Sequence, residues 1–208
     1  SKETIAHAKE HGLQVKMVTG DDVAIGSQIS GQLGMGTHLI AAADMFTKDM
    51  DMSHLPEPIT ENVERADGFG RVFPEHKYGI VHALQDRGHV VAMTGDGVND
   101  APALKRADAG IAMGKKGSEA AKEAAEFVLA DDNFASIAAA VREGRTVYDN
   151  IKKSILFILP TNGGEALVVL GSILFDFHQF PLTPVQILWV NMITVVALGT
   201  TLAFEPPE

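Results

Sequence analysis

Residues 94–104 read TGDGVNDAPAL, and this stretch decides how the chain is organised. The apolar run at 90–93 is β-branched and too short for a helix, so we expect a buried strand there. Two glycines then allow a tight turn and the close approach of a ligand to the backbone. Asn99 or Asp100 can cap a helix with Pro102 in its first turn. Such a strand tip suits a phosphate with its Mg²⁺, because carboxylates and a helix N-terminus meet there.

The same pattern is also typical of an ordinary strand–turn–helix connection with a capping Asp. A second loop upstream favours the phosphate site, because motifs gain weight from context. Thr-Gly-Asp occurs at residues 19–21 and again at 94–96, each time after a predicted strand. Ligands of an open parallel sheet bind beyond the carboxyl ends of its strands. We therefore expect one shared phosphate-binding crevice, lined by Thr19, Gly20, Asp21, Thr94, Gly95 and Asp96.

A third candidate is Lys77, in the first turn of a helix that opens with Pro74. The helix dipole disfavours a cation there, so Lys77 either has an anion nearby or points into water. Around these loops, predicted strands and helices alternate up to Ala130. This alternation predicts an α/β domain over residues 1–132, built on a doubly wound parallel sheet.

The stretch 94–113 resembles the hinge signature of P-type cation-transporting ATPases, whose phosphorylation domain belongs to the haloacid dehalogenase superfamily. The resemblance extends over essentially the whole chain. It implies that Asp96 ligates Mg²⁺ and that Asn99 binds the phosphoryl oxygens. Asp100 would complete the local charge network. The same family places a Lys like Lys77, and the Thr and Gly of the upstream loop, on the transferred phosphoryl group. Asp21 would be structural in that loop.

The composition limits the other classes. The net charge of −10 argues weakly against nucleic acid as a partner, and the absence of cysteine rules out disulfides and thiolate zinc sites. The excess of apolar residues is concentrated after residue 150. The chain begins at Ser1 without an initiator Met, so we expect it to be an interior piece of a longer protein.

The C-terminal third predicts two membrane spans. We expect a plain N-cap at residues 131–133, then an amphipathic stalk helix over 133–153. Spans of about 154–175 and 185–204 follow, joined by a short loop at 176–181, and Glu165 is the only charge within them. The alternative is a buried hairpin in a soluble protein. Basic residues precede the first span and none lies in the loop, so the α/β domain is expected in the cytoplasm.

The spans contain a candidate cation site. Glu165 in mid-membrane is costly and indicates function. Asn162 lies three residues before Glu165 on the same helix face, and Pro160 with its following glycines loosens the helix. The second span offers Asn191 and Thr194; these polar groups could instead only join the two helices by hydrogen bonds.

The membrane part resembles the ion-binding helices of the calcium-pump-like branch of the family. In calcium pumps an Asp follows the Thr, whereas this chain has Val195. Two-calcium transport is therefore not expected. The first part of the chain looks more like the proton-pump branch, so the transported ion stays open.

The family forms an aspartyl-phosphate from ATP on an Asp-Lys-Thr-Gly-Thr motif. Neither that motif nor a nucleotide-binding domain occurs in this sequence. The resemblance therefore implies half of a phosphorylation domain, inactive alone. Its partners would be the nucleotide-binding and actuator domains and the other membrane helices of the same pump, the bilayer and the transported cation. The alternatives are a membrane-anchored phosphatase of the same superfamily and a non-catalytic membrane subunit.

Overall fold

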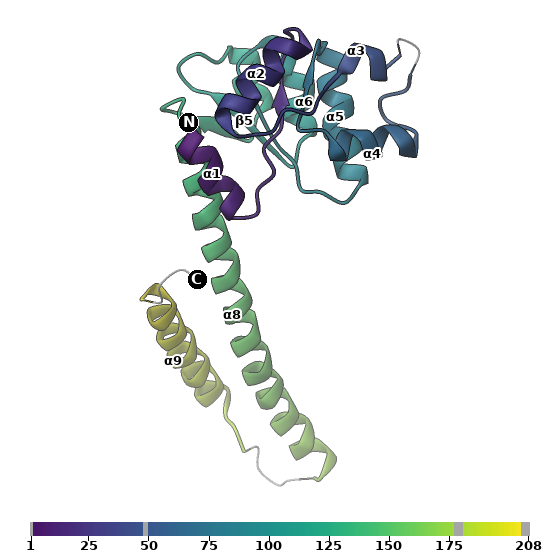
Figure 1. The fold of residues 1–208 in the computed structure, drawn as a ribbon. Helices are drawn as coiled ribbons and strands as arrows, with labels where there is room; N and C mark the ends of the chain where they lie inside the picture. Colours follow the sequence, from purple (N-terminus) through teal and green to yellow (C-terminus); the bar gives the residue numbers. More distant parts are fainter. Residues whose placement is uncertain (1, 48–49, 177–180, 205–208) are drawn as a thin grey trace. The chain divides into compact units, whose positions relative to one another are not determined.

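A computed structural model describes residues 2–47, 50–176 and 181–204. The chain forms two compact units, Ser1–Ala138 and Ala139–Glu208. Figure 1 traces the order of the elements along the chain. We describe each unit by itself. Most of the predicted loop at 176–181 lies outside the described residues.

The first sheet of the N-terminal unit has the strand order β1-β3-β2, and both pairings are parallel. Its strands are β1 (Met17–Val18), β2 (Leu39–Ala41) and β3 (Gly68–Gly70). A side chain at Gly68 would come within 2.5 Å of the carbonyl oxygen of Met17, so the central strand needs glycine there. The helices of this part are α1 (Lys2–Glu10), α2 (Val23–Leu33), α3 (Ala42–Met45) and α4 (Glu57–Arg65).

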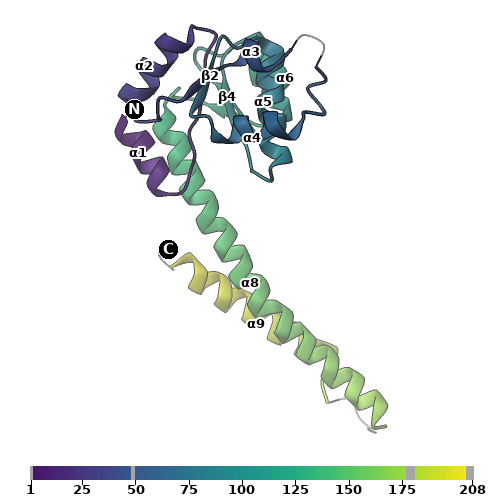
Figure 2. The same ribbon diagram turned by 45° about the vertical axis from the view of Figure 1, so that its right-hand side comes forward.

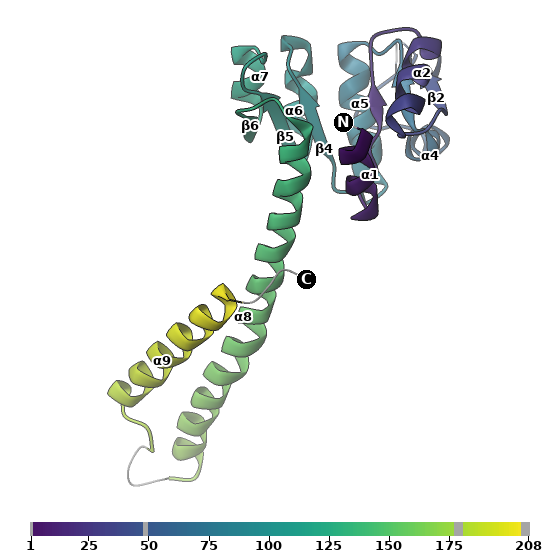
Figure 3. The same cartoon turned by 60° about the vertical axis from the view of Figure 1, so that its left-hand side comes forward.

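The second sheet has the order β4-β5-β6 and is also parallel. Its strands are β4 (Ala92–Gly95), β5 (Ala109–Met113) and β6 (Phe127–Leu129). The helices here are α5 (Pro74–Asp86), α6 (Ala101–Arg106) and α7 (Glu119–Ala124), with a 3₁₀ turn at Val98–Asp100 before α6. Figure 3 shows β4, β5 and β6 as one group, with β2 in another.

Helix α5 packs against both sheets. Ile80 and Ala83 join the core of the first sheet around Phe69, which is fully buried. Val81 packs instead with Ala103 of α6 and with Met93 of β4. Figure 2 shows α5 and α6 close together. Shared burial of apolar side chains on α5 therefore holds the two sheets in one unit.

The predicted alternation of parallel strands and helices is confirmed, but the strands form two three-stranded sheets instead of one. Among the described residues, β1 and β4 are both edge strands. The expectation of a buried strand at 90–93 was wrong: β4 begins only at Ala92, which is exposed, and Val90 is 89% exposed. The physical reason is that an edge strand keeps one side open.

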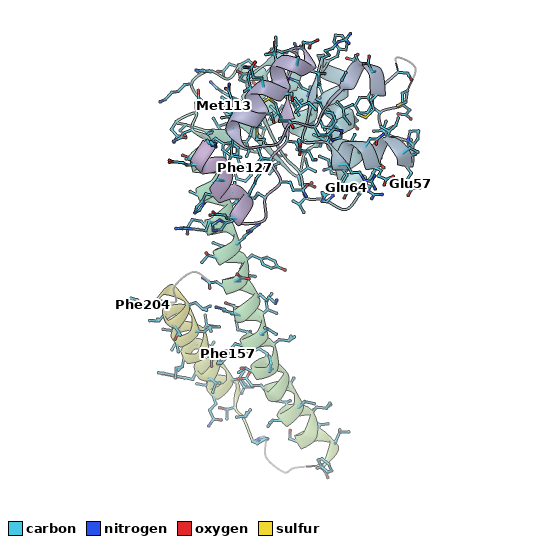
Figure 4. All side chains as sticks on the ribbon, in the orientation of Figure 1. Glu57, Glu64, Met113, Phe127, Phe157 and Phe204 are labelled. Atoms are coloured by element: carbon cyan, nitrogen blue, oxygen red, sulfur yellow. The ribbon has the colours of Figure 1, made fainter. Side chains whose placement is uncertain are left out.

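The second unit contains most of α8 (Phe134–Leu174) and all of α9 (Pro184–Ala203). The predicted stalk and first span form one helix, which continues through Pro160. Two helices among the described residues are long and apolar enough to cross a membrane, by length and composition. Their apolar side chains stand largely exposed, as Phe157 does at 50% (Figure 4). An exposed apolar surface of this extent fits contact with lipid.

Candidate functional site

The centre of the candidate site is an ion pair between Lys77 and Asp100. Lys77 Nζ lies 2.5 Å from Asp100 Oδ1, and the side chains are 21% and 7% exposed. Asp100 Oδ2 accepts hydrogen bonds from the backbone N–H groups of Asp96, at 3.2 Å, and Gly97, at 3.1 Å. Of the two alternatives for Lys77, the structure thus shows an anion nearby, and that anion is Asp100.

Asp100 differs from its predicted role as a helix cap. It precedes α6, but its side chain makes no capping hydrogen bond to that helix. The carboxylate turns back onto the glycine loop because this loop presents free N–H groups to it. A side chain at Gly95 would lie 2.5 Å from Cβ of Asp100, so only glycine fits there. The loop at 94–97 thus encloses the Asp100 carboxylate.

Asp96 and Asn99 are exposed next to this pair. The Asp96 carboxylate has no protein partner within the described chain, while its carbonyl oxygen accepts a hydrogen bond from Ser118 N at 2.8 Å. Mg²⁺ is usually held by one or two carboxylates, with water and phosphate oxygens as the other ligands. The open carboxylate of Asp96 fits that donor set. No cluster of three His, Cys, Asp or Glu side chains suited to a metal occurs in residues 2–47, 50–176 and 181–204.

The upstream Thr-Gly-Asp loop follows β1 and is held in place by the two residues that follow β3. Val72 N donates to the carbonyl of Thr19 at 3.1 Å, and Arg71 N donates to the carbonyl of Asp21 at 2.7 Å. Thr19 Oγ1 donates to Asp21 Oδ2 and accepts from Asp21 N, both at 3.2 Å. Asp21 thus orders its own loop. Within the described chain, no hydrogen bond joins this loop to residues 94–97.

The start of α5 is built around a buried neutral histidine. His76 is 5% exposed, and its Nδ1 accepts the backbone N–H of Phe73 at 3.3 Å. Burial lowers the pKa of His76, against the opposing charge of Glu75. A neutral ring is required for this bond, because a protonated imidazole has no acceptor. His76 therefore fixes the turn that presents Lys77.

In the second unit, α8 and α9 bring two of the four predicted cation-site residues together. Asn191 Nδ2 donates to Glu165 Oε2 at 3.1 Å, and Glu165 Oε1 is buried without a partner in the described residues. Asn162 is exposed and Thr194 half-buried, and neither contacts Glu165 by a hydrogen bond. A groove of about 510 Å³ includes Asn162 with Val147, Asn150, Ile151, Ser154, Ile155, Ile158 and Leu159.

Comparison with protein families and curated proteins agrees with this geometry. The family model described as haloacid dehalogenase-like hydrolase matches residues 1–108. This chain belongs to the haloacid dehalogenase-like hydrolases. A second model of the same description matches residues 80–141, and the model "Cation transporting ATPase, C-terminus" matches residues 179–208.

The curated relatives of this haloacid dehalogenase-like chain are named as ATPases. It is 49% identical over 205 residues to "Probable cation-transporting ATPase F" of Mycobacterium tuberculosis, covering 98% of this chain and 22% of that protein. It is 48% identical to "Cation-transporting ATPase pma1" of Synechocystis, covering 93% of this chain and 21% of that protein, and 44% identical to "Calcium-transporting ATPase" of Bacillus subtilis, covering 100% and 23%. The expected similarity to cation-transporting ATPases is confirmed. The chain spans about a fifth of the length of these relatives.

Sequence reasoning missed two residues that support the dehalogenase-like site. The backbone N–H of Ser118 donates to the carbonyl oxygen of Asp96. The Asp132 carboxylate accepts the backbone N–H groups of Lys115 and Lys116. The capping expectation for residues 131–133 is confirmed for Asn133, which accepts Ala135 N at 3.1 Å. It was wrong for Asp132, whose partners lie 16 and 17 residues earlier in the chain. No local pattern marks such a distant pairing.

Proposed function

We propose that this chain is part of an ATP-driven cation pump that works through an aspartyl-phosphate. The observation that carries the proposal is the Lys77–Asp100 pair set in the glycine loop at 94–97. Phosphoryl transfer relies mainly on positioning and electrostatic stabilisation. The fixed Lys77 ammonium can stabilise negative charge on a phosphoryl group, and the open Asp96 carboxylate beside it can position a Mg²⁺ ion. The similarity to named cation-transporting ATPases supports the same function.

Each residue of the site then has a defined task. Asp96 holds Mg²⁺, which neutralises charge on the phosphoryl oxygens when it is bound. Asn99 donates to a phosphoryl oxygen. Lys77 places its charge toward the transferred group, and Asp100 fixes the direction of that charge. Thr19 and Gly20 approach the same group from the upstream loop, where Thr19 offers a hydroxyl and Gly20 an N–H.

The nucleophile belongs to a part of the pump outside this chain. Both Thr-Gly-Asp loops follow edge strands, β1 in one sheet and β4 in the other. Ala92 and Thr94 of β4 are exposed, so the strand lacks cover on that side. We assign the place between β1 and β4 to the strand that carries the phosphorylated Asp, because its carboxyl end would then reach both loops. ATP would bind mainly to a further domain of the pump.

The helices α8 and α9 form the transport part of this proposal. The α/β unit faces the cytoplasm, in line with the basic residues that precede the first apolar stretch. Glu165 and Asn191 contribute to the cation site, and the unpartnered Oε1 of Glu165 is available to the ion. Asn162 and Thr194 join them once the remaining membrane helices are present.

The test is ATP-driven cation flux by the full-length protein in liposomes. The proposal predicts flux of at least one of H⁺, Ca²⁺, Na⁺, K⁺ or Mg²⁺ that needs ATP and internal or external Mg²⁺. The variant Asp96→Asn should abolish it, while Asp108→Asn, whose carboxylate accepts the N–H of Val91 at the opposite end of β4 from the glycine loop, should not. Absence of flux for every cation tested, with an intact purified protein, would overturn the proposal.

A further inference from the structure

The loop between β5 and α7 touches the candidate phosphate site at one end. Ser118 N donates to the carbonyl oxygen of Asp96 at 2.8 Å. Ser118 Oγ accepts the N–H of Ala121 at 3.2 Å and so caps α7. The backbone of Asp96 is therefore fixed to the N-terminus of a neighbouring helix. A shift of the Asp96 backbone would therefore strain or break its hydrogen bond with Ser118.

The other end of this loop is bound by Asp132. Its Oδ1 accepts the N–H of Lys115 and its Oδ2 the N–H of Lys116, both at 3.0 Å. These backbone hydrogen bonds, of which the one from Lys115 has the largest effect, hold the pKa of Asp132 below its usual range. Hydrogen bonds to an ionised acceptor are about twice as strong as neutral ones. One carboxylate thus fixes two successive peptide groups.

The backbone of the loop at residues 114–118 is closely packed against neighbouring backbone. A side chain at Gly117 would lie 2.0 Å from the carbonyl oxygen of Met113, and one at Gly114 would lie 2.8 Å from that of Leu129. Gly114 N also donates to the Leu129 carbonyl at 3.0 Å. Because packed segments of this kind shift as a whole, displacement at Ser118 reaches Lys115 and Lys116.

Asp132 lies two residues before α8. Its φ angle of +54° places it in the left-handed region. Asp131 accepts Ser136 Oγ at 2.6 Å and Asn133 N at 3.1 Å, which ties the preceding residue to the first turn of α8. The segment at 131–136 is therefore held by its own hydrogen bonds. A displacement of Asp132 would therefore also displace the first turn of α8.

We propose that Asp132 is a positioning residue that links the Asp96 loop, through residues 114–118, to the first turn of α8. The inference rests on the proposed function, in which Asp96 binds Mg²⁺ beside the phosphoryl group and α8 carries Glu165. Occupation of the phosphate site then changes the start of α8 through named hydrogen bonds. Asp132 touches neither phosphate nor cation.

The decisive variant is Asp132→Gly, because glycine accepts the positive φ and removes both acceptor oxygens. Asp132→Asn keeps one acceptor oxygen. The matched control is Asp108→Gly, since Asp108 also accepts a backbone N–H, that of Val91 at 2.8 Å. Cations transported per ATP hydrolysed are measured for the full-length pump in liposomes. We expect Asp132→Gly to lower this ratio by about fivefold or more, with ATP hydrolysis largely kept.

The outcomes separate the two proposals. An intermediate ratio for Asp132→Asn and an unchanged one for Asp108→Gly support the link. A parallel loss of hydrolysis and transport, with the ratio unchanged, shows a merely structural role and overturns it. If the wild-type protein transports nothing, the proposed function fails, and amide hydrogen exchange with Mg²⁺ and inorganic phosphate decides the link. Protection should then spread from residues 95–97 to 134–138 in the wild type but stop at 95–97 in Asp132→Gly; equal spreading in both overturns it.

Discussion

Lys77 Nζ and Asp100 Oδ1 lie 2.5 Å apart, although the two residues are separated by 23 positions and come from different helices and loops. The pair is unequal. Asp100 also accepts two backbone N–H groups from the glycine loop, whereas within the described residues the Lys77 ammonium pairs with Asp100 alone. Loss of either residue should therefore have different consequences.

Asp100→Ala is expected to destabilise the protein more than Lys77→Met does. The first change leaves a largely buried ammonium and two N–H groups without an acceptor, at a cost of about 3–5 kcal/mol. The second leaves Asp100 bound to its two backbone donors and should cost about 1–3 kcal/mol. Urea unfolding of the full-length protein compares the two. Equal costs would show that the backbone donors to Asp100 contribute little.

Acid should weaken the turn that presents Lys77. Burial holds the pKa of His76 below its ordinary value, so the unfolded chain binds the proton more readily than the folded one. The stabilisation is complete above the pKa of the unfolded histidine, about 6.5. It is lost as the pH falls from there through the lower pKa of His76 in the folded protein. The melting temperature is measured between neutral and mildly acidic pH.

His76→Asn should remove part of this acid sensitivity, because an amide oxygen can accept the N–H of Phe73 without titrating. The control is His54→Asn, since the His54 side chain is 87% exposed. A pH dependence that stays unchanged in His76→Asn would contradict the assigned role of the ring.

Glu165→Gln should change the ion dependence of ATP hydrolysis. Removal of the charge weakens cation binding, and we expect the cation concentration for half-maximal hydrolysis to rise on the order of tenfold. Nucleotide binding should be unaffected. Thr161→Val is a matched control on α8, because the Thr161 hydroxyl donates to the carbonyl of Phe157 in its own helix. An unchanged ion dependence would remove Glu165 from the site.

The purified chain of residues 1–208 should hydrolyse no ATP. The Asp-Lys-Thr-Gly-Thr motif implied by the family resemblance is absent from its sequence. Phosphate release is compared with that of the Asp96→Ala form of the same chain. Release by the wild-type chain above that level would contradict a missing nucleophile.

Much of the fold could be predicted because the signals are local. Gly34 ends α2 with a φ of +76°, as its position after an apolar helix predicts. The spacing of Pro74 and Lys77 likewise predicts the first turn of α5. The split into two sheets could not be predicted, because strand pairing depends on partners distant in sequence. The same holds for Asp132, whose partners lie in another loop.

The same division between local and distant signals applies to the candidate site. The glycine loop marked Asp96, Asn99 and Asp100, and the helix dipole left Lys77 either beside an anion or pointing into water. The sequence pattern assigned Asp100 to the helix that follows it, whereas the structure turns its carboxylate toward Gly97. In the spans, a helical spacing of three placed Asn162 beside Glu165. Glu165 is hydrogen-bonded to Asn191 of α9, which the sequence also assigned to the site, and not to Asn162.

Phosphoenzyme formation by the full-length protein tests the central claim most directly. The protein is incubated with Mg²⁺ and ATP labelled in the γ-phosphate, and acid-stable protein-bound label is counted. We predict label in the wild type, its loss in Asp96→Ala and its retention in the control Asp108→Ala. Undiminished label in Asp96→Ala would contradict the assignment of residues 94–104 to the phosphoryl-transfer site.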